Sequence, residues 1–242
     1  MGSQRKTVVV TGASQGIGDA VAKALLNRGY NVVGTSRSMS RSSVLPRSEQ
    51  LTLIDGDVAE AATAARVTQE AVNRFGSIDG LVNNAGIFLS KRFTDYTVED
   101  FQALSAVNLY GFLHMTQAVI RQMLAQARGG SIVSISASVA RSPIAGVPCG
   151  VPMMTKGGIE AASRNLALEF AKDGIRVNIV APGAVRTPLV RDVPEEALRA
   201  MSPIHRVAEA KEIAEAVVFL IEAPQVTGET LHVDGGAHVG KW

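Results

Sequence analysis

Short runs of apolar and β-branched residues alternate along the chain with longer stretches in which apolar residues recur at the spacing of a helix. The short runs predict strands at residues 7–10, 31–35, 51–54, 80–83, 131–135, 175–180 and 229–233. The longer stretches predict helices at about residues 17–25, 60–75, 97–107, 108–126, 152–172 and 210–221. Because the strands are apolar on both faces and alternate with helices, they indicate an α/β fold with a parallel sheet covered on both sides.

The alternation runs from end to end without a linker rich in proline, glycine or serine, an internal repeat or a low-complexity segment. A chain of 242 residues can hold one large α/β domain or two small ones, and the missing linker favours a single domain over residues 1–242. The apolar fraction of 46% is ample for its core.

Composition and charge exclude several classes of protein. The net charge is only +2, with both signs interspersed, so we expect neither a nucleic-acid surface nor a polybasic membrane surface. The single cysteine, Cys149, excludes an internal disulfide framework, and the scattered histidines predict no metal site. The polar start does not resemble a signal peptide, and no apolar run approaches the ~20 residues of a membrane span. A soluble cytoplasmic protein is the expectation.

The turn after the first predicted strand carries the clearest candidate chemistry. It places three glycines between that strand and the first predicted helix. Glycines permit a tight turn and a close backbone approach, and the free N–H groups of a helix start bind a diphosphate. A purely structural turn does not need three glycines at this spacing, so the motif predicts a dinucleotide site. The candidate residues are Gly12, Ser14, Gln15, Gly16, Ile17 and Gly18.

The spacing T-G-x-x-x-G-I-G of this turn resembles that of the short-chain dehydrogenase/reductase family. The resemblance continues over nearly the whole chain, through Asp57-Val58, Asn83-Asn84-Ala85-Gly86, Asn108, the serine-rich end of the strand at 131–135, Lys156, Pro182-Gly183 with Thr187, and Thr227-Gly228 before Val233-Asp234-Gly235-Gly236. It implies a Rossmann-like, doubly wound sheet of seven parallel strands between two helical layers. It also implies a homotetramer or homodimer built on the helices at 108–126 and 152–172.

The end of the second predicted strand bears on the choice of cofactor. Rossmann sites for NAD place an acid there to bind the ribose 2′-hydroxyl, whereas an arginine nearby accommodates the 2′-phosphate of NADP. Here the strand is followed by Arg37 and by no acid, which favours NADP(H) over NAD(H), with an ordinary surface arginine as the alternative.

The resemblance implies further cofactor contacts. Asp57 would hold the adenine edge, with Val58 packed near it. The adenine-ribose side would be lined by the segment of Asn83, Asn84, Ala85 and Gly86. Thr187 would meet the nicotinamide carboxamide beside the turn of Pro182 and Gly183.

The resemblance also implies a catalytic group of an asparagine, a serine, a tyrosine and a lysine. Asn108 would order a water behind Lys156. Lys156 would lower the pKa of the tyrosine and bind the nicotinamide ribose. Ser138 would hydrogen-bond the substrate oxygen, with Ser136 as its rival, because the segment reads as the family's I-S-S-V-A with one residue inserted.

The tyrosine that would transfer the proton is missing. Its position, one helical turn before Lys156, holds Pro152, and no tyrosine lies between Ser138 and Lys156. Proline is compatible with the first turn of a helix, and residues four apart share a helix face, so we expect the ring to occupy the space of the phenol. Candidate substitute acids are Ser138, Thr155, Cys149, Lys156 itself and a bound water.

Two functions are compatible with these residues. The first is an NADP(H)-dependent oxidoreductase of the short-chain type, with an altered proton-transfer route, acting on a small carbonyl, alcohol or C=N substrate. The second is an NAD(P)-binding protein without dehydrogenase activity, acting as a sensor or partner subunit. The cofactor motifs together with Lys156 and Ser138 favour the first. Residues 188–205 correspond to the family's mobile lid, and the identity of the substrate stays open.

Overall fold

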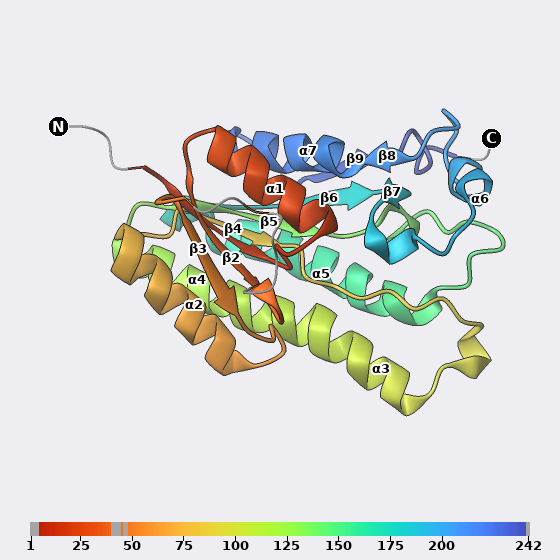
Figure 1. Ribbon diagram of the computed structural model, residues 1–242, viewed down its shortest axis with the longest axis horizontal. Helices are drawn as coiled ribbons and strands as arrows, with labels where there is room; N and C mark the ends of the chain where they lie inside the picture. The colour runs from red at the N-terminus through yellow and green to blue at the C-terminus, as the bar shows by residue number, and fades with distance from the viewer. Residues whose placement is uncertain (1–4, 40–44, 46–47, 241–242) are drawn as a thin grey trace.

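A parallel sheet of seven strands forms the middle layer of the molecule (Figure 1). In the computed structural model, which describes residues 5–39, 45 and 48–240, the strand order is β3-β2-β1-β4-β5-β6-β9. The strands are β1 Thr7–Thr11, β2 Asn31–Ser36, β3 Leu51–Asp55, β4 Gly80–Asn83, β5 Gly130–Ile135, β6 Ile175–Pro182 and β9 Thr230–Val233. All the predicted strands are therefore confirmed, each within two residues of its predicted ends.

Helices cover both faces of this sheet, which confirms the doubly wound, three-layer fold. One face carries α1 (Gly16–Asn27) and α7 (Ala210–Glu222), and the other carries α2 (Ala61–Phe75), α4 (Gly111–Gln126) and α5 (Gly150–Glu169). Each face has its own core, and successive residues of β1 serve opposite cores. Val8 and Val10 pack in the core with α1 and α7, whereas Val9 packs in the core with α2 and α4.

The predicted helices at 97–107 and 108–126 form one continuous run of helical structure. The first part, α3 (Val98–Leu104), begins with a capping box in which Thr97 and Asp100 exchange hydrogen bonds at 3.2 and 2.9 Å. It passes into α4 through a π-helical turn, Ser105–Tyr110. Such turns are rare and occur frequently at functional sites. This one contains Asn108.

Helix α5 starts earlier than predicted. It begins at Gly150 rather than at Pro152, ends at Glu169, and is followed by a short 3-10 turn at Ala171–Asp173. Its first backbone hydrogen bond runs from Met153 N to the carbonyl oxygen of Cys149, at 3.1 Å. The nitrogen of Pro152 thus lies among those that have no partner within a helix, and proline disturbs no hydrogen bond there.

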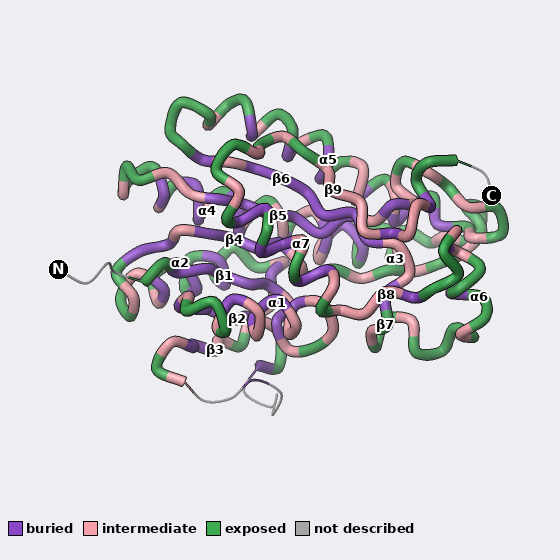
Figure 2. Tube along the Cα trace, turned by 90° about the horizontal axis from the view of Figure 1, so that it is seen from above, coloured by how far each residue is buried: buried purple, intermediate pink, exposed green. Residues whose placement is uncertain are grey.

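The segment that corresponds to the lid lies between two very short strands that the sequence pattern did not predict. These strands, β7 (Val185–Arg186) and β8 (Ala208–Glu209), pair in parallel as a separate small sheet. Between them lie a 3-10 turn, Pro188–Val190, and the short helix α6, Glu195–Arg199. Figure 2 shows the main sheet buried through the middle of the molecule and the segment around α6 largely exposed. None of the helices in the described ranges has both the length and the apolar character that a membrane crossing requires.

Candidate active site

The candidate residues lie at the carboxyl edge of the sheet, around the place where its winding reverses. After β1 the chain continues to β2 on one side, whereas after β4 it continues to β5 on the other, and β1 and β4 are direct neighbours. In open α/β sheets, ligands bind outside the carboxyl ends of the strands at such a switch point.

The glycine turn occupies this position after β1. Gly12 has a φ of +67°, and a Cβ there would lie only 2.8 Å from Asn84 Nδ2. A Cβ on Gly18 would collide with the carbonyl oxygen of Gly12, so α1 can approach the turn this closely only with glycine at that position. The two glycines therefore allow β1, the start of α1 and the segment after β4 to pack closely around the turn.

The start of α1 fits an anionic group. Gln15 is the N-cap residue, and its side chain makes no capping hydrogen bond. The N–H groups of the first turn are thus left for a ligand, and the positive end of the helix dipole favours a diphosphate there. The acidic residue of this turn, Asp19, pairs with Lys23 at 2.9 Å. The turn and helix start therefore fit the diphosphate of a dinucleotide.

Thr11 and Asn84 fasten the end of β4 to the glycine turn. The Asn84 amide donates to the carbonyl oxygens of Thr11 and Gly12, at 2.9 and 3.2 Å. The Thr11 hydroxyl accepts from the backbone N–H groups of Asn84 and Ala85, both at 3.0 Å. The side chain of Asn84 therefore maintains the shape of the turn, and Ala85 and Gly86 continue along the same edge.

Arg37 lies one residue beyond β2 and near the glycine turn. The N–H groups of Gly12 and Ala13 both donate to the carbonyl oxygen of Thr35, at 2.7 and 3.3 Å, and so join the turn to the end of β2. Arg37 is exposed, and its guanidinium has no hydrogen-bond or ion-pair partner among the described residues. A cation in this place fits a second phosphate group on the adenosine half of a dinucleotide.

Asp57 and Val58 begin the segment after β3. One carboxylate oxygen of Asp57 accepts from the N–H of Ala59 at 2.9 Å. Val58 is buried against the start of α4, where a Cβ on Gly111 would lie 2.8 Å from Val58 Cγ2. Val58 thus anchors the segment, and Asp57 stays at the edge of the sheet.

The π-helical turn places Asn108 in a buried network with α5. Its amide oxygen accepts from the N–H of Ile87 at 2.9 Å, and its amide nitrogen donates to the Ile87 carbonyl at 3.1 Å and to Thr155 Oγ1 at 3.0 Å. The Thr155 hydroxyl donates onward to the carbonyl oxygen of Pro152 at 2.7 Å. Both polar ends of the Asn108 amide therefore have protein partners, and the network joins the segment after β4 to the first turn of α5.

Lys156 lies beside Asn108. Its ammonium donates to the carbonyl oxygen of Ile135 at 2.7 Å, at the end of β5. A Cβ on Gly86 would lie 3.3 Å from both Lys156 Nζ and Asn108 Oδ1, so the bare backbone of Gly86 leaves room for both groups. Because burial removes water from the ammonium, the pKa of Lys156 falls from 10.5 to about 8. Lys156 can therefore gain or lose a proton close to neutral pH.

The structure separates the two candidate serines. Ser136 directly follows β5, and its hydroxyl donates to a carboxylate oxygen of Glu160 at 2.6 Å. Ser138 begins a 3-10 turn, Ser138–Ala140, and is 2% exposed. Its hydroxyl has no hydrogen-bond partner within the described ranges. Of the two, only the Ser138 hydroxyl is left for another molecule.

Glu160 is a residue of this site that the sequence analysis missed. It lies one turn after Lys156 in α5 and is 2% exposed. Its second carboxylate oxygen accepts from Arg141 Nε at 2.6 Å, and Arg164 approaches the same oxygen at 3.8 Å. One signal was present in the sequence: an acidic residue lies four positions after Lys156 and therefore on the same face of the helix.

The other groups near Pro152 offer few acidic protons. Pro152 itself is buried in the first turn of α5. Cys149, the N-cap residue of this helix, is 6% exposed, and burial raises the pKa of its thiol. Thr155 is fully buried, and its hydroxyl is bonded on both sides, as described above.

The remaining predicted cofactor residues lie where the lid begins. A Cβ on Gly16 would be 3.4 Å from Thr187, so Thr187 faces the glycine turn. Gly183 packs against the carboxyl-terminal segment. Its N–H donates to the carbonyl oxygen of Val233 at 3.1 Å, and a Cβ on Gly183 would lie 2.9 Å from the Cα of Asp234. With Pro182 at the end of β6, these residues line the far side of the same edge.

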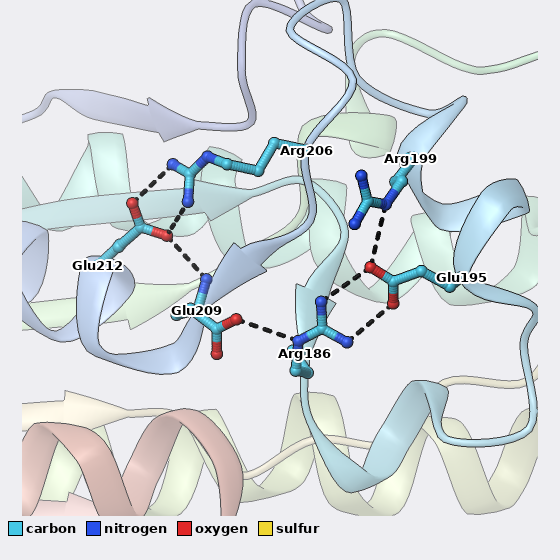
Figure 3. Close-up of polar contacts among 6 residues, drawn as sticks. All are labelled: Arg186, Glu195, Arg199, Arg206, Glu209 and Glu212. Carbon is cyan, nitrogen blue, oxygen red and sulfur yellow. Dashed lines mark hydrogen bonds and ion pairs between the residues drawn. The ribbon is translucent and has the colours of Figure 1, made fainter.

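A chain of ion pairs ties the lid to β8 and α7 (Figure 3). Arg186 makes a two-pronged contact with Glu195 of α6, at 2.8 Å for both bonds, and also donates to Glu209 at 3.0 Å. Glu195 accepts a further bond from Arg199 at 3.2 Å. Beyond the lid, Arg206 and Glu212 form a second two-pronged pair at 2.8 and 2.6 Å.

Comparison with known sequences shows one consistent relationship. A family described as "Enoyl-(Acyl carrier protein) reductase" matches residues 12–238. Carbonyl reductase family member 4 of Xenopus laevis is 37% identical over 233 residues, which cover 96% of this chain and 97% of that protein. The human 3-oxoacyl-[acyl-carrier-protein] reductase is 36% identical over 233 residues, with 96% and 97% covered.

Solved structures agree with the sequence relatives. The 3-ketoacyl-(acyl-carrier-protein) reductase from Brucella melitensis, in complex with NADH, superposes with a TM-score of 0.90 at 28% identity, over 98% of this chain and 100% of that chain. ElxO with NADP bound superposes with a TM-score of 0.88 at 28% identity, over 98% and 100%. Proteins with this fold and related sequences thus bind nicotinamide cofactors of both kinds.

Proposed function

The chain belongs to the short-chain dehydrogenase/reductase family and is an oxidoreductase of that type; we propose that it uses NADP(H) and exchanges hydride with a small carbonyl, alcohol or C=N substrate. The observation that carries the proposal is the arrangement at one edge of the sheet. An uncapped helix start follows the glycine turn, and the exposed Arg37 lies near it. Lys156 bonds to the last residue of β5, and Ser138 begins the turn that follows this strand.

Each cofactor residue has a defined task in this proposal. The N–H groups at the start of α1 bind the diphosphate, Arg37 pairs with the 2′-phosphate, and Lys156 binds the nicotinamide ribose. Thr187 meets the carboxamide. The bound nicotinamide supplies or accepts the hydride. The preference for NADP(H) rests on Arg37 and on the absence of an acid at the end of β2; among the structural relatives, ElxO was solved with NADP and the Brucella reductase with NADH.

We assign the proton of the reaction to Lys156, in place of the missing phenol. Pro152 has no proton to give, the buried Cys149 thiol holds its proton more tightly than an ordinary thiol, and the Thr155 hydroxyl is bonded to a backbone carbonyl. The Lys156 ammonium can donate three hydrogen bonds and makes one to a described residue. With a pKa of about 8 it holds a proton at neutral pH and can pass it to the substrate oxygen, directly or through the Ser138 hydroxyl.

The cofactor assignment is tested by titrating the purified protein with NADPH and with NADH. NADPH is expected to bind more tightly. Arg37→Ser is expected to weaken NADPH binding about tenfold or more and to leave NADH binding unchanged, because a hydrogen bond to a charged group is worth about 1.5–3 kcal/mol. Equal affinity of the unaltered protein for the two cofactors would overturn the assignment.

The activity is tested on a panel of ketones, aldehydes, imines and a 3-oxoacyl thioester, with alcohols for the reverse direction. At least one member is expected to be turned over with matching loss or gain of NADPH. Pro152→Tyr is expected to raise ketone reduction, since general acid catalysis is typically worth about 10²–10⁴-fold. Cofactor binding without turnover of any panel member would reject the oxidoreductase reaction proposed here.

A second candidate function has one observation in its favour. Pro152 occupies the position at which the family's tyrosine is expected, and a buried ring there suits a protein that binds NADP(H) as a sensor or as a partner subunit. Robust turnover by the purified chain alone would eliminate this candidate.

A further inference from the structure

The buried carboxylate of Glu160 has donors on both of its oxygens. Ser136 Oγ donates to one oxygen and Arg141 Nε to the other, each at 2.6 Å. Arg164, at 3.8 Å, adds a second positive charge. A carboxylate at 2% exposure is stable only when such partners replace its lost hydration. Glu160 therefore joins α5 to both ends of a segment that is distant from it in the sequence.

These two partners bracket Ser138. Ser136 precedes it by two residues and Arg141 follows it by three. Between them the backbone closes into a turn, in which the N–H groups of Arg141 and Ser142 donate to the carbonyl oxygen of Ser138 at 3.2 and 3.0 Å. The turn is thus fixed within itself by backbone bonds, and it is fixed to the rest of the molecule by Glu160.

The same helix holds Lys156. Lys156 donates to the carbonyl of Ile135, and one turn later Glu160 accepts from the hydroxyl of Ser136, the next residue of the chain. Successive turns of α5 therefore bind successive residues at the end of β5. Lys156 and Glu160 thus hold the chain directly before Ser138 against one helix.

We propose that Glu160 is a positioning residue: by holding Ser136 and Arg141 against α5, it sets the Ser138 hydroxyl in register with Lys156. This inference rests on the proposed oxidoreductase function. It also explains the extra residue before Ser138, because the inserted segment supplies Ser136 as a support and leaves Ser138 for the substrate oxygen.

The test is a double-mutant cycle measured with NADPH and the best substrate of the panel. Glu160→Gln keeps the shape of the side chain and a partner for Ser136, but it presents an amide to Arg141 and so loses that bond. We expect kcat to fall about tenfold or more, since small displacements of catalytic groups carry penalties of this size, while the Kd of NADPH stays within about twofold. In the background of Ser138→Ala the same substitution is expected to change kcat little, because Glu160 acts through Ser138.

A merely structural role predicts a different result. It would lower kcat by the same factor in both backgrounds, in step with a lower melting temperature, and this outcome would overturn the proposal. Ser136→Ala and Arg141→Gln each remove one partner of Glu160, and the same double-mutant cycle with Ser138→Ala is measured for both. The test therefore stands even if Glu160→Gln does not fold. Arg164→Gln is the matched control: it alters the charge near Glu160 without touching the Ser138 segment, and we expect kcat to be unchanged.

The outcome is distinguishable from a failure of the proposed function. Absence of turnover by the unaltered protein would reject the oxidoreductase reaction and, with it, this role of Glu160. Normal turnover by the unaltered protein, together with normal kcat in Glu160→Gln, would reject the positioning role alone.

Discussion

The chemistry of the site depends on single residues whose ordinary properties are changed by burial. Lys156 is the clearest case, because the surrounding protein lowers its pKa to about 8. A surface lysine, with a pKa near 10.4, would hold its proton too firmly to exchange it at neutral pH. The same burial opposes the charged form in the folded state, so the contribution of Lys156 to stability is lowest below pH 8 and rises between pH 8 and 10.5.

The pH dependence of the reaction follows from this pKa. Carbonyl reduction needs the protonated ammonium, so kcat/KM is expected to fall as the pH rises through about 8, whereas alcohol oxidation needs the free amine and is expected to rise. Steady-state rates between pH 6 and 10 in both directions provide the measurement. Pro152→Tyr is the comparison, because its phenol would take over the proton transfer, and the pH dependence of the rates would then no longer follow the pKa of Lys156. Parallel profiles in the two directions would contradict the role of Lys156.

The resemblance proposed a catalytic group, but the sequence did not predict the residues that support it. The resemblance favoured Ser138 but kept Ser136 as a rival, because one residue is inserted in this segment. The decision comes from Glu160, which lies 24 residues after Ser136 and engages it in the folded structure. A contact of this kind arises only when the helix packs on the sheet, so no local pattern reports it.

The elements of the fold differ in how far the sequence determines them. Strands such as β1 and β4 are buried along their whole length, and their short apolar runs were sufficient to predict them. The π-helical turn at Ser105–Tyr110 escaped prediction, since its residues fit an α-helix equally well. The two-residue strands β7 and β8 also escaped, because two residues are too few to show a period.

The junction between the π-helical turn and α5 makes a testable contribution to stability. Thr155→Val keeps the shape of the side chain but removes two buried hydrogen bonds, the one from the Asn108 amide nitrogen and the one to the Pro152 carbonyl. The expected loss in the free energy of unfolding is about 1–3 kcal/mol, measured by urea denaturation. Thr68→Val on α2 is the control, where a part-buried hydroxyl bonds only to the carbonyl of Ala64, and a smaller loss is expected.

The lid offers a second prediction at the level of elements. Arg186 joins α6 to β8, through Glu195 and Glu209. Arg186→Gln is expected to speed trypsin cleavage after Arg191 and Arg199 several-fold, with little change in the melting temperature, because only the lid is released.

The matched control for the lid is Arg28→Gln. Arg28 also pairs with two carboxylates, those of Glu215 and Glu222, at 3.1 and 2.7 Å, but these lie farther along α7, toward its carboxyl-terminal end. Its loss is expected to leave lid cleavage unchanged. High salt should speed cleavage of the unaltered protein toward the rate of Arg186→Gln, since exposed ion pairs are screened. Equal cleavage of both variants would contradict the arrangement in Figure 3 as a restraint on the lid.

At the scale of the whole molecule, the two helical layers differ in how much apolar surface they expose. Helices α4 and α5 carry Leu113, Leu124, Met154 and Leu168, which are 45%, 39%, 56% and 81% exposed. Exposed apolar groups on neighbouring elements are typical of protein interfaces. We propose that these helices join copies of the chain into a homodimer or homotetramer.

Light scattering after size exclusion is the measurement for this proposal. The unaltered protein is expected to have two or four times the chain mass of 25.4 kDa. Leu113→Glu is expected to reduce the mass, because a buried charge without a partner disfavours the interface. Leu189→Glu is the control, since this residue is 61% exposed but belongs to the lid. A monomeric unaltered protein would rule the assembly out.

The first turn of α5 has a consequence for how such a protein changes over time. The nitrogen of residue 152 precedes the first hydrogen bond of the helix, so neither a proline ring nor an aromatic side chain at this position removes a hydrogen bond from α5. Proline and tyrosine can therefore occupy this position on the same scaffold, and an acid can be supplied or withheld here without any change in the hydrogen bonds of the helix.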